Sequence, residues 1–311
     1  MNVGRTNCLS ARTPARGGTR LSHSQMLNAG PPPAPEDIPD VGNVDVRAAT
    51  ENFVVAARLL PARLRRDLVA LYGYARLVDE LGDAVDGDRS AWLDWAEDEL
   101  DAAVAGRARH PVFVRLGTTL GRGIDPQPCY DLIEANRLDQ VVQRYETFDD
   151  LLGYCRLSAN PVGRLVLGAL GLDDPGRVAR SDAVCTALQL VEHWQDLAED
   201  ARAGRRYVPA EDLERFGVVE DELTSTPASP RLRALVSFEC DRARRLLVEG
   251  APLVATVPGL ARVAVAGFVG GGLAALRAVA AAGFDVTAGA PVSSPTARAV
   301  ATLEALSGRI R

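Results

Sequence analysis

The spacing of apolar residues along the chain predicts helices. In the stretch from Pro61 to Val85 the apolar positions recur at steps of three and four residues: Leu64, Leu68, Leu71, Ala75 and Val78. That period places them on one face of a helix. Nowhere do apolar and polar residues alternate over the length of a strand with turn residues on both sides. The pattern therefore predicts an all-α fold.

The same pattern predicts the order of the helices. Their expected ranges are 48–60, 61–85, 92–105, 111–125, 129–146, 148–170, 182–203, a short helix ending at 216, 231–249 and 257–282. Pro161 falls inside one of these ranges, and a proline inside a helix predicts a kink or a break there. Gly204 follows another range as a C-terminal cap.

Both ends of the chain lack this periodicity. Residues 1–46 contain a proline run and many small polar residues, which predicts a disordered N-terminal tail. Residues 291–311 predict a weakly ordered C-terminal tail. Without an internal repeat between them, residues 47–290 are expected to form one catalytic domain.

Composition narrows the class of protein. The formal net charge of −6 argues against a nucleic-acid binder, although all 35 basic residues are arginine. The five cysteines are widely spaced, so they indicate free thiols in a reducing cytoplasm and neither a zinc site nor a disulfide framework. No window has the about 18 consecutive apolar residues of a membrane span. The nearest is 263–276, which Arg262 and Arg277 close.

An acidic stripe follows one of the predicted helices. Gln189, Glu192, Asp196 and Asp200 succeed one another at steps of three, four and four residues, on a helix that is otherwise largely apolar. Buried carboxylates are costly to keep ionised unless a cation neutralises them. Hard divalent cations prefer such oxygen ligands, so the stripe indicates a metal site. A solvated acidic face is the alternative that this stripe alone leaves open.

A second stripe favours the metal. Tyr72, Arg76, Asp79 and Asp83 follow at steps of four, three and four, about 110 residues earlier in the chain. It too is set in an apolar helix. A solvated surface does not require such a pair of stripes, whereas a metal site shared by two helices does.

Together the stripes and their flanking motifs resemble the squalene and phytoene synthase family. The motifs occur in the family's order: Leu60-Pro61-Ala62-Arg63-Leu64-Arg65, the first stripe, Tyr154-Cys155, the second stripe, Gly204-Arg205-Arg206-Tyr207-Val208-Pro209 and Gly283-Phe284-Asp285-Val286. The resemblance implies a single-domain class I isoprenoid synthase fold. In it two aspartate-rich helices face each other across a central cavity and hold Mg²⁺ against a prenyl diphosphate.

The resemblance also implies roles for individual residues. Metal ligands would be Asp79, Asp83, Asp196 and Asp200, with Glu192 as an added ligand where the family usually has Asn. Diphosphate contacts would be Asn52, Phe53, Arg76, Gln189, Arg205 and Tyr207, and Tyr72 and Tyr154 would line the cavity. The expected cofactor is Mg²⁺, with Mn²⁺ as a substitute. No nicotinamide cofactor is expected, because no GxGxxG follows a strand.

Departures from the family pattern indicate one branch. Glu51-Asn52-Phe53 and Ser158-Ala159-Asn160-Pro161-Val162-Gly163 look like the hydroxysqualene synthase branch of bacterial hopanoid pathways. That branch ionises presqualene diphosphate, rearranges the cation and captures it with water, giving hydroxysqualene and pyrophosphate. Ser158 and Asn160 would be catalytic, because they add polar groups that can hold a water. A helix break at Pro161 is the alternative explanation of Asn160.

Other functions stay open on these residues. The main alternative is a head-to-head prenyl transferase that makes presqualene diphosphate, squalene or phytoene. A distant one is a non-catalytic assembly protein of the same fold, which would have lost the aspartates that this chain keeps. The expected partners are a prenyl diphosphate and other squalene-pathway enzymes. The expected location is the cytoplasm, with peripheral contact at the inner face of the plasma membrane.

Overall fold

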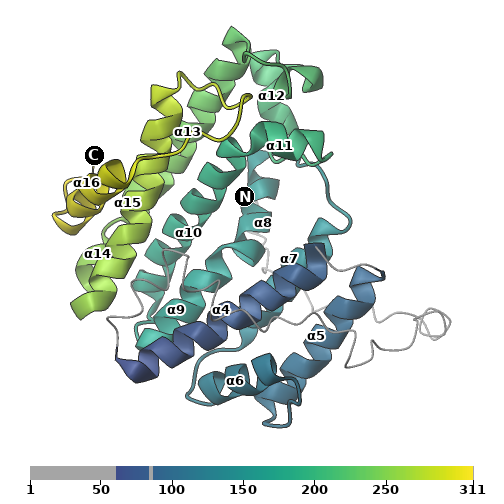
Figure 1. The fold of residues 1–311 in the computed structure, drawn as a ribbon, viewed down its shortest axis with the longest axis vertical. Helices are drawn as coiled ribbons and strands as arrows, with labels where there is room; N and C mark the ends of the chain where they lie inside the picture. Colours follow the sequence, from purple (N-terminus) through teal and green to yellow (C-terminus); the bar gives the residue numbers. More distant parts are fainter. Residues whose placement is uncertain (1–60, 84–86, 311) are drawn as a thin grey trace, which may run out of the picture. The chain divides into compact units, whose positions relative to one another are not determined.

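The chain folds into helices, as the periodicity predicts. The computed structural model describes residues 61–83 and 87–310, all in one structural unit, and this part of the chain contains no strand (Figure 1). The helices, labelled as in Figure 1, are α4 Ala62–Asp83, α5 Arg89–Val104, α6 Pro111–Leu120, α7 Gln127–Asp139, α8 Phe148–Ser158, α9 Asn160–Leu170, α10 Pro175–Gln195, α11 Leu197–Arg202, α12 Ala210–Phe216, the 3₁₀ turn η2 Glu220–Leu223, α13 Pro230–Gly250, α14 Leu253–Thr256, α15 Gly259–Ala281 and α16 Pro295–Leu306. The expected helix at 48–60 and the tail at 1–46 lie outside the described residues.

Local sequence signals set several helix boundaries. The Thr147 side chain accepts a hydrogen bond from Asp150 N while the Asp150 carboxylate accepts one from Thr147 N, which is a capping box at the start of α8. Asp174 caps α10 in front of Pro175, whose missing N–H is no loss in the first turn. The predicted interruption near Pro161 is confirmed, since α8 ends at Ser158 and α9 begins at Asn160.

The helices pack around two apolar cores. One core joins α4, α5, α6 and α7, where the Tyr74 ring is fully buried and its hydroxyl donates to Cys129 O at 2.8 Å. The other joins α8, α10, α13 and α15, and the Trp194 side chain is fully buried in it. In Figure 1, α10, α13 and α15 run side by side, and α4 lies with α5, α6 and α7.

Helix α15 is apolar enough to raise the question of a membrane span. By length and composition alone its residues Gly259–Ala281 would qualify, but half of the apolar window is buried inside the protein. Gly272 lets α15 pack closely on α10, since a Cβ there would lie 2.7 Å from a Leu188 side-chain carbon. A core helix passes the same test of length and composition, and the packing of α15 against α10, α13 and α16 is that of a core helix.

The structure corrects the expectation for the C-terminal tail. Residues 295–306 form the regular helix α16, capped by Ser294, instead of a weakly ordered segment. A Cβ on Gly270 would lie 2.5 Å from Thr302 N, so glycine lets the backbones of α15 and α16 approach closely. The buried contacts on α16 are made by Ala301 and Ala305. Alanines give a weak hydrophobic signal, which is why the periodicity missed this helix.

The acidic helix also departs from the expectation of one continuous helix over 182–203. Helix α10 ends at Gln195 and α11 begins at Leu197, with Asp196 between them at φ −95° and ψ 7°. Hydrogen bonds from Asp196 N to Glu192 O and from Asp200 N to Asp196 O, both 2.9 Å, carry the chain across the break. The second acidic stripe therefore lies on two successive helices, α10 and α11, which are separated by one residue.

Candidate functional site

A cavity of about 520 Å³ is lined by residues of both cores, among them Leu132 of one and Leu167 of the other. Among the described residues, α4, α7, α8, α9, α10, α14 and α15 contribute to its wall, together with the loop after α11. Along α10 the lining changes from apolar Val184 and Leu188 to polar Gln189 and Glu192. The lining positions of α10 alone, from Ser181 to Glu192, span about 16 Å at 1.5 Å per residue. The cavity is thus long, apolar over much of its wall and acidic where α4 and α10 contribute carboxylates.

The first acidic motif contributes two carboxylates to this cavity. Asp79 and Asp83 line it, while Arg76 lies outside the lining and pairs with Glu80 at 3.9 Å. Asp79 faces the cavity and is open to solvent there, but protein atoms surround the rest of the carboxyl group. This loss of hydration raises the pKa of Asp79 to about 6, with a smaller push from Asp83 and opposition from Asn136 and Arg76.

The second acidic motif reaches the cavity with its first half. Gln189 and Glu192 line the wall, whereas Asp196 lies at the break and Asp200 follows it on α11. Burial raises the pKa of Glu192, and the charge of Asp196 adds to the shift. Burial likewise raises the pKa of Asp196, and it raises that of Asp200 to about 6 against the nearby charge of Arg205. A cation bound beside these carboxyl groups would stabilise their ionised forms.

Arg205 joins the two motifs. Its Nη2 donates to Asp83 Oδ1 at 3.2 Å, and its backbone N donates to Asp200 O at 2.9 Å. Gly204, at φ +84°, turns the chain after α11 so that Arg205 can reach the cavity. Burial by itself lowers the pKa of Arg205, but Tyr207, Asp83 and the nearby Asp139 outweigh it and raise the pKa. The guanidinium is therefore fully charged and available to an anion.

Tyr154 and Tyr207 line the cavity inside an aromatic cluster. The Tyr207 ring stacks on His193 with centroids 3.6 Å apart, and Tyr154 lies 5.9 Å from Tyr207. His193 and Gln189 share a hydrogen bond of 3.2 Å between their Nε2 atoms. Burial lowers the pKa of His193 to about 3, so the imidazole is neutral. The imidazole thus contacts two residues of the cavity wall, Tyr207 by stacking and Gln189 by a hydrogen bond.

Asp139, on α7, was not singled out from the sequence. It lines the cavity and accepts a hydrogen bond from Tyr154 Oη at 2.9 Å. Burial raises its pKa to about 6, and Tyr154 and Arg205 oppose the shift. The residues three and four positions before Asp139 on α7, Asn136 and Ala135, are not acidic, so Asp139 belongs to no acidic stripe in the sequence. Only the packing of α7 against α8 brings it to the site.

Ser158 and Asn160 have different surroundings. Ser158 belongs to the cavity wall, and its hydroxyl is buried without a hydrogen-bond partner among the described residues. Asn160 is 3% exposed and lies outside the lining, where its Oδ1 accepts from Thr186 Oγ1 at 2.9 Å. This contact between α9 and α10 favours the helix-break explanation of Asn160. A buried hydroxyl without a partner, as in Ser158, is typical of a site for an ordered water.

The structure thus gathers part of the expected site. Residues brought to the cavity are Asp79, Asp83, Tyr154, Ser158, Gln189, Glu192, Arg205 and Tyr207. Residues that do not line it are Tyr72, Arg76, Asn160, Asp196 and Asp200. Asn52 and Phe53 lie outside the described residues. The functional roles of all these residues stay predictions.

The donor set fits a divalent cation of one kind. In residues 61–83 and 87–310, no group of three or more His, Cys, Asp and Glu side chains closes around a point that could hold a metal by itself. Mg²⁺ is commonly held by one or two carboxylates and completes its shell with water and substrate phosphates. Carboxylates on two facing helices, with raised pKa values and an arginine between them, suit that mode of binding.

Comparison with known proteins identifies the family. The family model for squalene/phytoene synthase matches residues 46–301. The chain belongs to the squalene/phytoene synthase family. Its enzymes act on prenyl diphosphates and normally use a divalent metal, so the chain is an isoprenoid synthase of that class.

Relatives and solved structures agree with the family. A hydroxysqualene synthase from Rhodopseudomonas palustris is 35% identical over 67% of this chain and 71% of its own length. A phytoene synthase from Arthrospira platensis is 34% identical over 63% of this chain and 68% of its own. The crystal structure of a squalene synthase from Alicyclobacillus acidocaldarius has 42% identity and a TM-score of 0.74, covering 78% of this chain and 95% of that one. The all-α class I isoprenoid synthase fold expected from the sequence is confirmed.

Proposed function

We propose that this squalene/phytoene synthase ionises presqualene diphosphate and captures the rearranged cation with water. The products are hydroxysqualene and pyrophosphate, on a route to squalene and hopanoids. Three similar proteins are named hydroxysqualene synthase, at 35%, 33% and 35% identity. The observation that carries the water-capture step is the buried hydroxyl of Ser158, which has no partner among the described residues and sits in the wall of the cavity.

The acidic motifs hold the departing diphosphate. Asp79, Asp83 and Glu192 line the cavity, and Asp196 and Asp200 follow Glu192 at the helix break and on α11. A divalent ion bound there, Mg²⁺ or Mn²⁺, would stabilise the negative charge of the leaving pyrophosphate. Arg205 supplies a fixed positive charge beside Asp83, with a planar group that suits two phosphate oxygens at once.

The apolar wall protects the cation from random capture. Val166, Leu188, Val265 and Phe268 line the cavity and offer no nucleophile. A hydroxyl in such a wall can hold one water by a hydrogen bond while the bulk solvent is excluded. Ser158 would therefore set the position at which the cation meets oxygen.

A second candidate is a head-to-head prenyl transferase. Phytoene synthases from two cyanobacteria of the genera Synechococcus and Synechocystis are 34% and 35% identical to this chain, as similar as the hydroxysqualene synthases. That reaction joins two prenyl diphosphates instead of hydrolysing one. The apolar wall and the acidic motifs would serve either reaction, but the buried Ser158 hydroxyl favours the one that consumes water.

A panel of substrates separates these candidates. The purified protein with Mg²⁺ would receive presqualene, farnesyl or geranylgeranyl diphosphate, each with and without NADPH, and products would be identified by mass spectrometry. We expect hydroxysqualene from presqualene diphosphate, at a rate that NADPH does not change. Phytoene from geranylgeranyl diphosphate would support the second candidate, and a switch to squalene with NADPH would contradict water capture.

The cellular setting is part of the same proposal. A substrate and product of about thirty carbons partition into lipid, so a cytoplasmic protein that touches the inner face of the plasma membrane, beside other squalene-pathway enzymes, fits the chemistry. Val162, in the cavity wall, is 42% exposed and offers an apolar contact at the surface. Flotation with liposomes at low and high salt tests this setting. A protein that stays in the soluble fraction at both salt concentrations would contradict it.

A further inference from the structure

A short segment after α15 contacts the ends of both helices of the second acidic motif. We define the C-terminal strap as residues 283–291. Gln195, the last residue of α10, donates from Nε2 to Pro291 O at 2.6 Å. Arg202, the last residue of α11, donates from Nη2 to Thr287 O at 3.1 Å. The strap therefore receives one hydrogen bond from each side of the break at Asp196.

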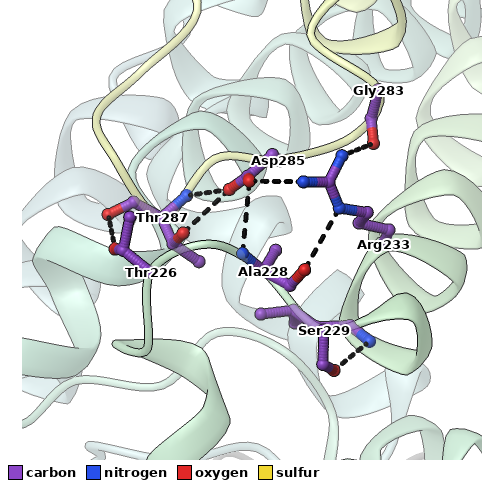
Figure 2. A network of polar contacts seen from close by, with 8 residues as sticks. Thr226, Ala228, Ser229, Arg233, Gly283, Asp285 and Thr287 are labelled. Atoms are coloured by element: carbon purple, nitrogen blue, oxygen red, sulfur yellow. Dashed lines mark hydrogen bonds and ion pairs between the residues drawn. The ribbon is translucent and has the colours of Figure 1, made fainter.

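Hydrogen bonds to α13 and to the residues just before it anchor the strap (Figure 2). Asp285 accepts hydrogen bonds from Arg233 Nη2 at 2.7 Å, Ala228 N at 3.2 Å and Thr287 Oγ1 at 2.8 Å. Burial by itself raises the pKa of Asp285, but these donors outweigh it and lower the pKa, so the carboxylate is charged. Thr226 Oγ1 donates to Thr287 O at 3.1 Å, the same carbonyl that Arg202 contacts.

Arg233 ties the start of the strap to α13. Its Nη1 donates to Gly283 O and its Nε donates to Ala228 O, both at 3.1 Å, while Nη2 holds Asp285 (Figure 2). Val286 and Thr287, in the middle of the strap, are each 1% exposed. The strap is thus buried at Val286 and Thr287 and hydrogen-bonded over residues 283–287. Burial and hydrogen bonding make that part of the strap a rigid support.

The second acidic motif needs such a support. Asp196 joins α10 to α11 without a side-chain cap, so the relative direction of the two helices is not fixed by one regular helix. Glu192 stands before the break and Asp200 after it. Ligands for one metal–diphosphate group must keep fixed positions relative to each other, and small displacements weaken binding strongly.

We propose that the C-terminal strap is a positioning element that sets the angle across the Asp196 break, through Gln195 and Arg202, and so holds the second acidic motif in place for a metal-bound diphosphate. Gln195 and Arg202 act through the helix ends and are positioning residues. The proposal rests on the acidic motifs binding a metal diphosphate, but not on the identity of the prenyl chain or of the product.

Two substitutions of similar length remove the donors. Gln195→Met and Arg202→Met each delete one hydrogen bond to the strap and keep an unbranched side chain. The matched control is Arg262→Met, because Arg262 Nη2 donates to Leu306 O at 2.9 Å and so ties α15 to α16 without touching the acidic helices. Arg202→Lys restores a donor and serves as the conservative rescue.

The readout is binding, measured without turnover. Thermal unfolding is followed at rising Mn²⁺ concentrations with inorganic pyrophosphate, and the half-saturating Mn²⁺ concentration is taken from the gain in melting temperature. The double variant Gln195→Met with Arg202→Met should need about tenfold more Mn²⁺ than the wild type, since two hydrogen bonds are lost. Arg202→Lys should recover most of the affinity, and Arg262→Met should bind as the wild type does.

Each result bears on the proposal. A double variant that melts lower but binds Mn²⁺ and pyrophosphate as tightly as the wild type would overturn it, because the strap would then only anchor the C-terminal helix. Asp285→Asn offers a second probe from outside the acidic motif and should shift the Mn²⁺ requirement in the same direction by about threefold. A wild type that gains no stability from Mn²⁺ and pyrophosphate would contradict the proposed metal site and the strap's role together.

Discussion

The two acidic motifs that face the cavity are held in different ways. Asp79 and Asp83 stand on one unbroken helix, α4, so helical geometry alone fixes their spacing. Glu192 and Asp200 stand on two helices that meet at Asp196, where the strap contacts both helix ends. The first motif is thus a local structure. The second depends on residues far away in the chain.

This difference explains what the sequence reveals about each motif. The stripe from Tyr72 to Asp83 predicts helix α4 well. The second stripe assumes a continuous helix, which the break at Asp196 contradicts. A motif held by tertiary contacts cannot be placed from its own spacing.

The largest effect is expected from removing one carboxylate of each motif. Asp79→Asn and Asp196→Asn should each lower turnover by about a thousandfold, because a neutral amide cannot replace an ionised metal ligand. The far-ultraviolet circular dichroism should stay unchanged. Steady-state kinetics with a prenyl diphosphate at saturating Mg²⁺ measures the loss.

Asp94→Asn is the control for these variants. Asp94 is exposed on α5 and pairs with Arg137 at 2.7 Å, outside the cavity. Its turnover should match that of the wild type. Equal losses in Asp94→Asn and Asp79→Asn would mean that the assay reports general instability, and full activity in excess chelator would contradict the metal role of both motifs.

The next effect concerns the residue shared by the two motifs. Arg205→Met should lower kcat/KM by about a hundredfold, since it removes a charge-assisted contact to the diphosphate and the link to Asp83. Arg206→Met is the matched control: Arg206 is the neighbouring arginine, it lies 3.9 Å from Glu220 and it is absent from the cavity lining. If both variants lose activity to the same extent, Arg205 has no special role between the motifs.

A smaller effect should appear in the products. Ser158→Ala leaves both acidic motifs intact, so pyrophosphate release should persist while the share of hydroxysqualene falls by about tenfold in favour of elimination products. Ser181→Ala is the control, because Ser181 also lines the cavity but its hydroxyl forms a hydrogen bond with the Cys185 side chain. Gas chromatography of the extracted products measures the ratio. An identical product profile in the two variants would remove Ser158 from the mechanism.

The smallest effect tests the support of the loop that carries Arg205. Helix α12 follows this loop, and its Asp212 meets Arg242 and Glu239 of α13 in a buried cluster. Burial raises the pKa of Glu239 from its ordinary 4.5 to about 8, and the charge of Asp212 adds to the shift against that of Arg242. The folded protein therefore keeps a proton that the unfolded chain releases between pH 4.5 and 8.

Stability should accordingly fall as the pH rises through this window, by at most about 1.4 kcal/mol per pH unit. Below pH 4.5 the contribution of Glu239 is fully present, and above pH 8 it is lost. Glu239→Gln mimics the protonated acid, so its urea midpoint should depend less on pH than that of the wild type. Parallel curves for the two proteins would mean that Glu239 does not hold this proton.

The sequence predicted the helical fold and the first motif because both arise from short-range periodicity. It missed α16, whose contacts with α15 rely on Gly270 and alanines. It also missed Asp139, which reaches the cavity only through the packing of α7 on α8. For Asn160 the spacing could not tell a cavity residue from one that bonds Thr186 between two helices. In each case the missing information lies in contacts between distant segments.

The most direct test of the account is a reaction of presqualene diphosphate in ¹⁸O-labelled water. Ionisation breaks the carbon–oxygen bond, so all the original oxygens leave with pyrophosphate and the captured water supplies the alcohol. We predict one solvent oxygen in hydroxysqualene and none in pyrophosphate. Label in the released pyrophosphate, with an unlabelled thirty-carbon alcohol, would show cleavage at phosphorus and contradict the account. A thirty-carbon product without oxygen would also contradict it.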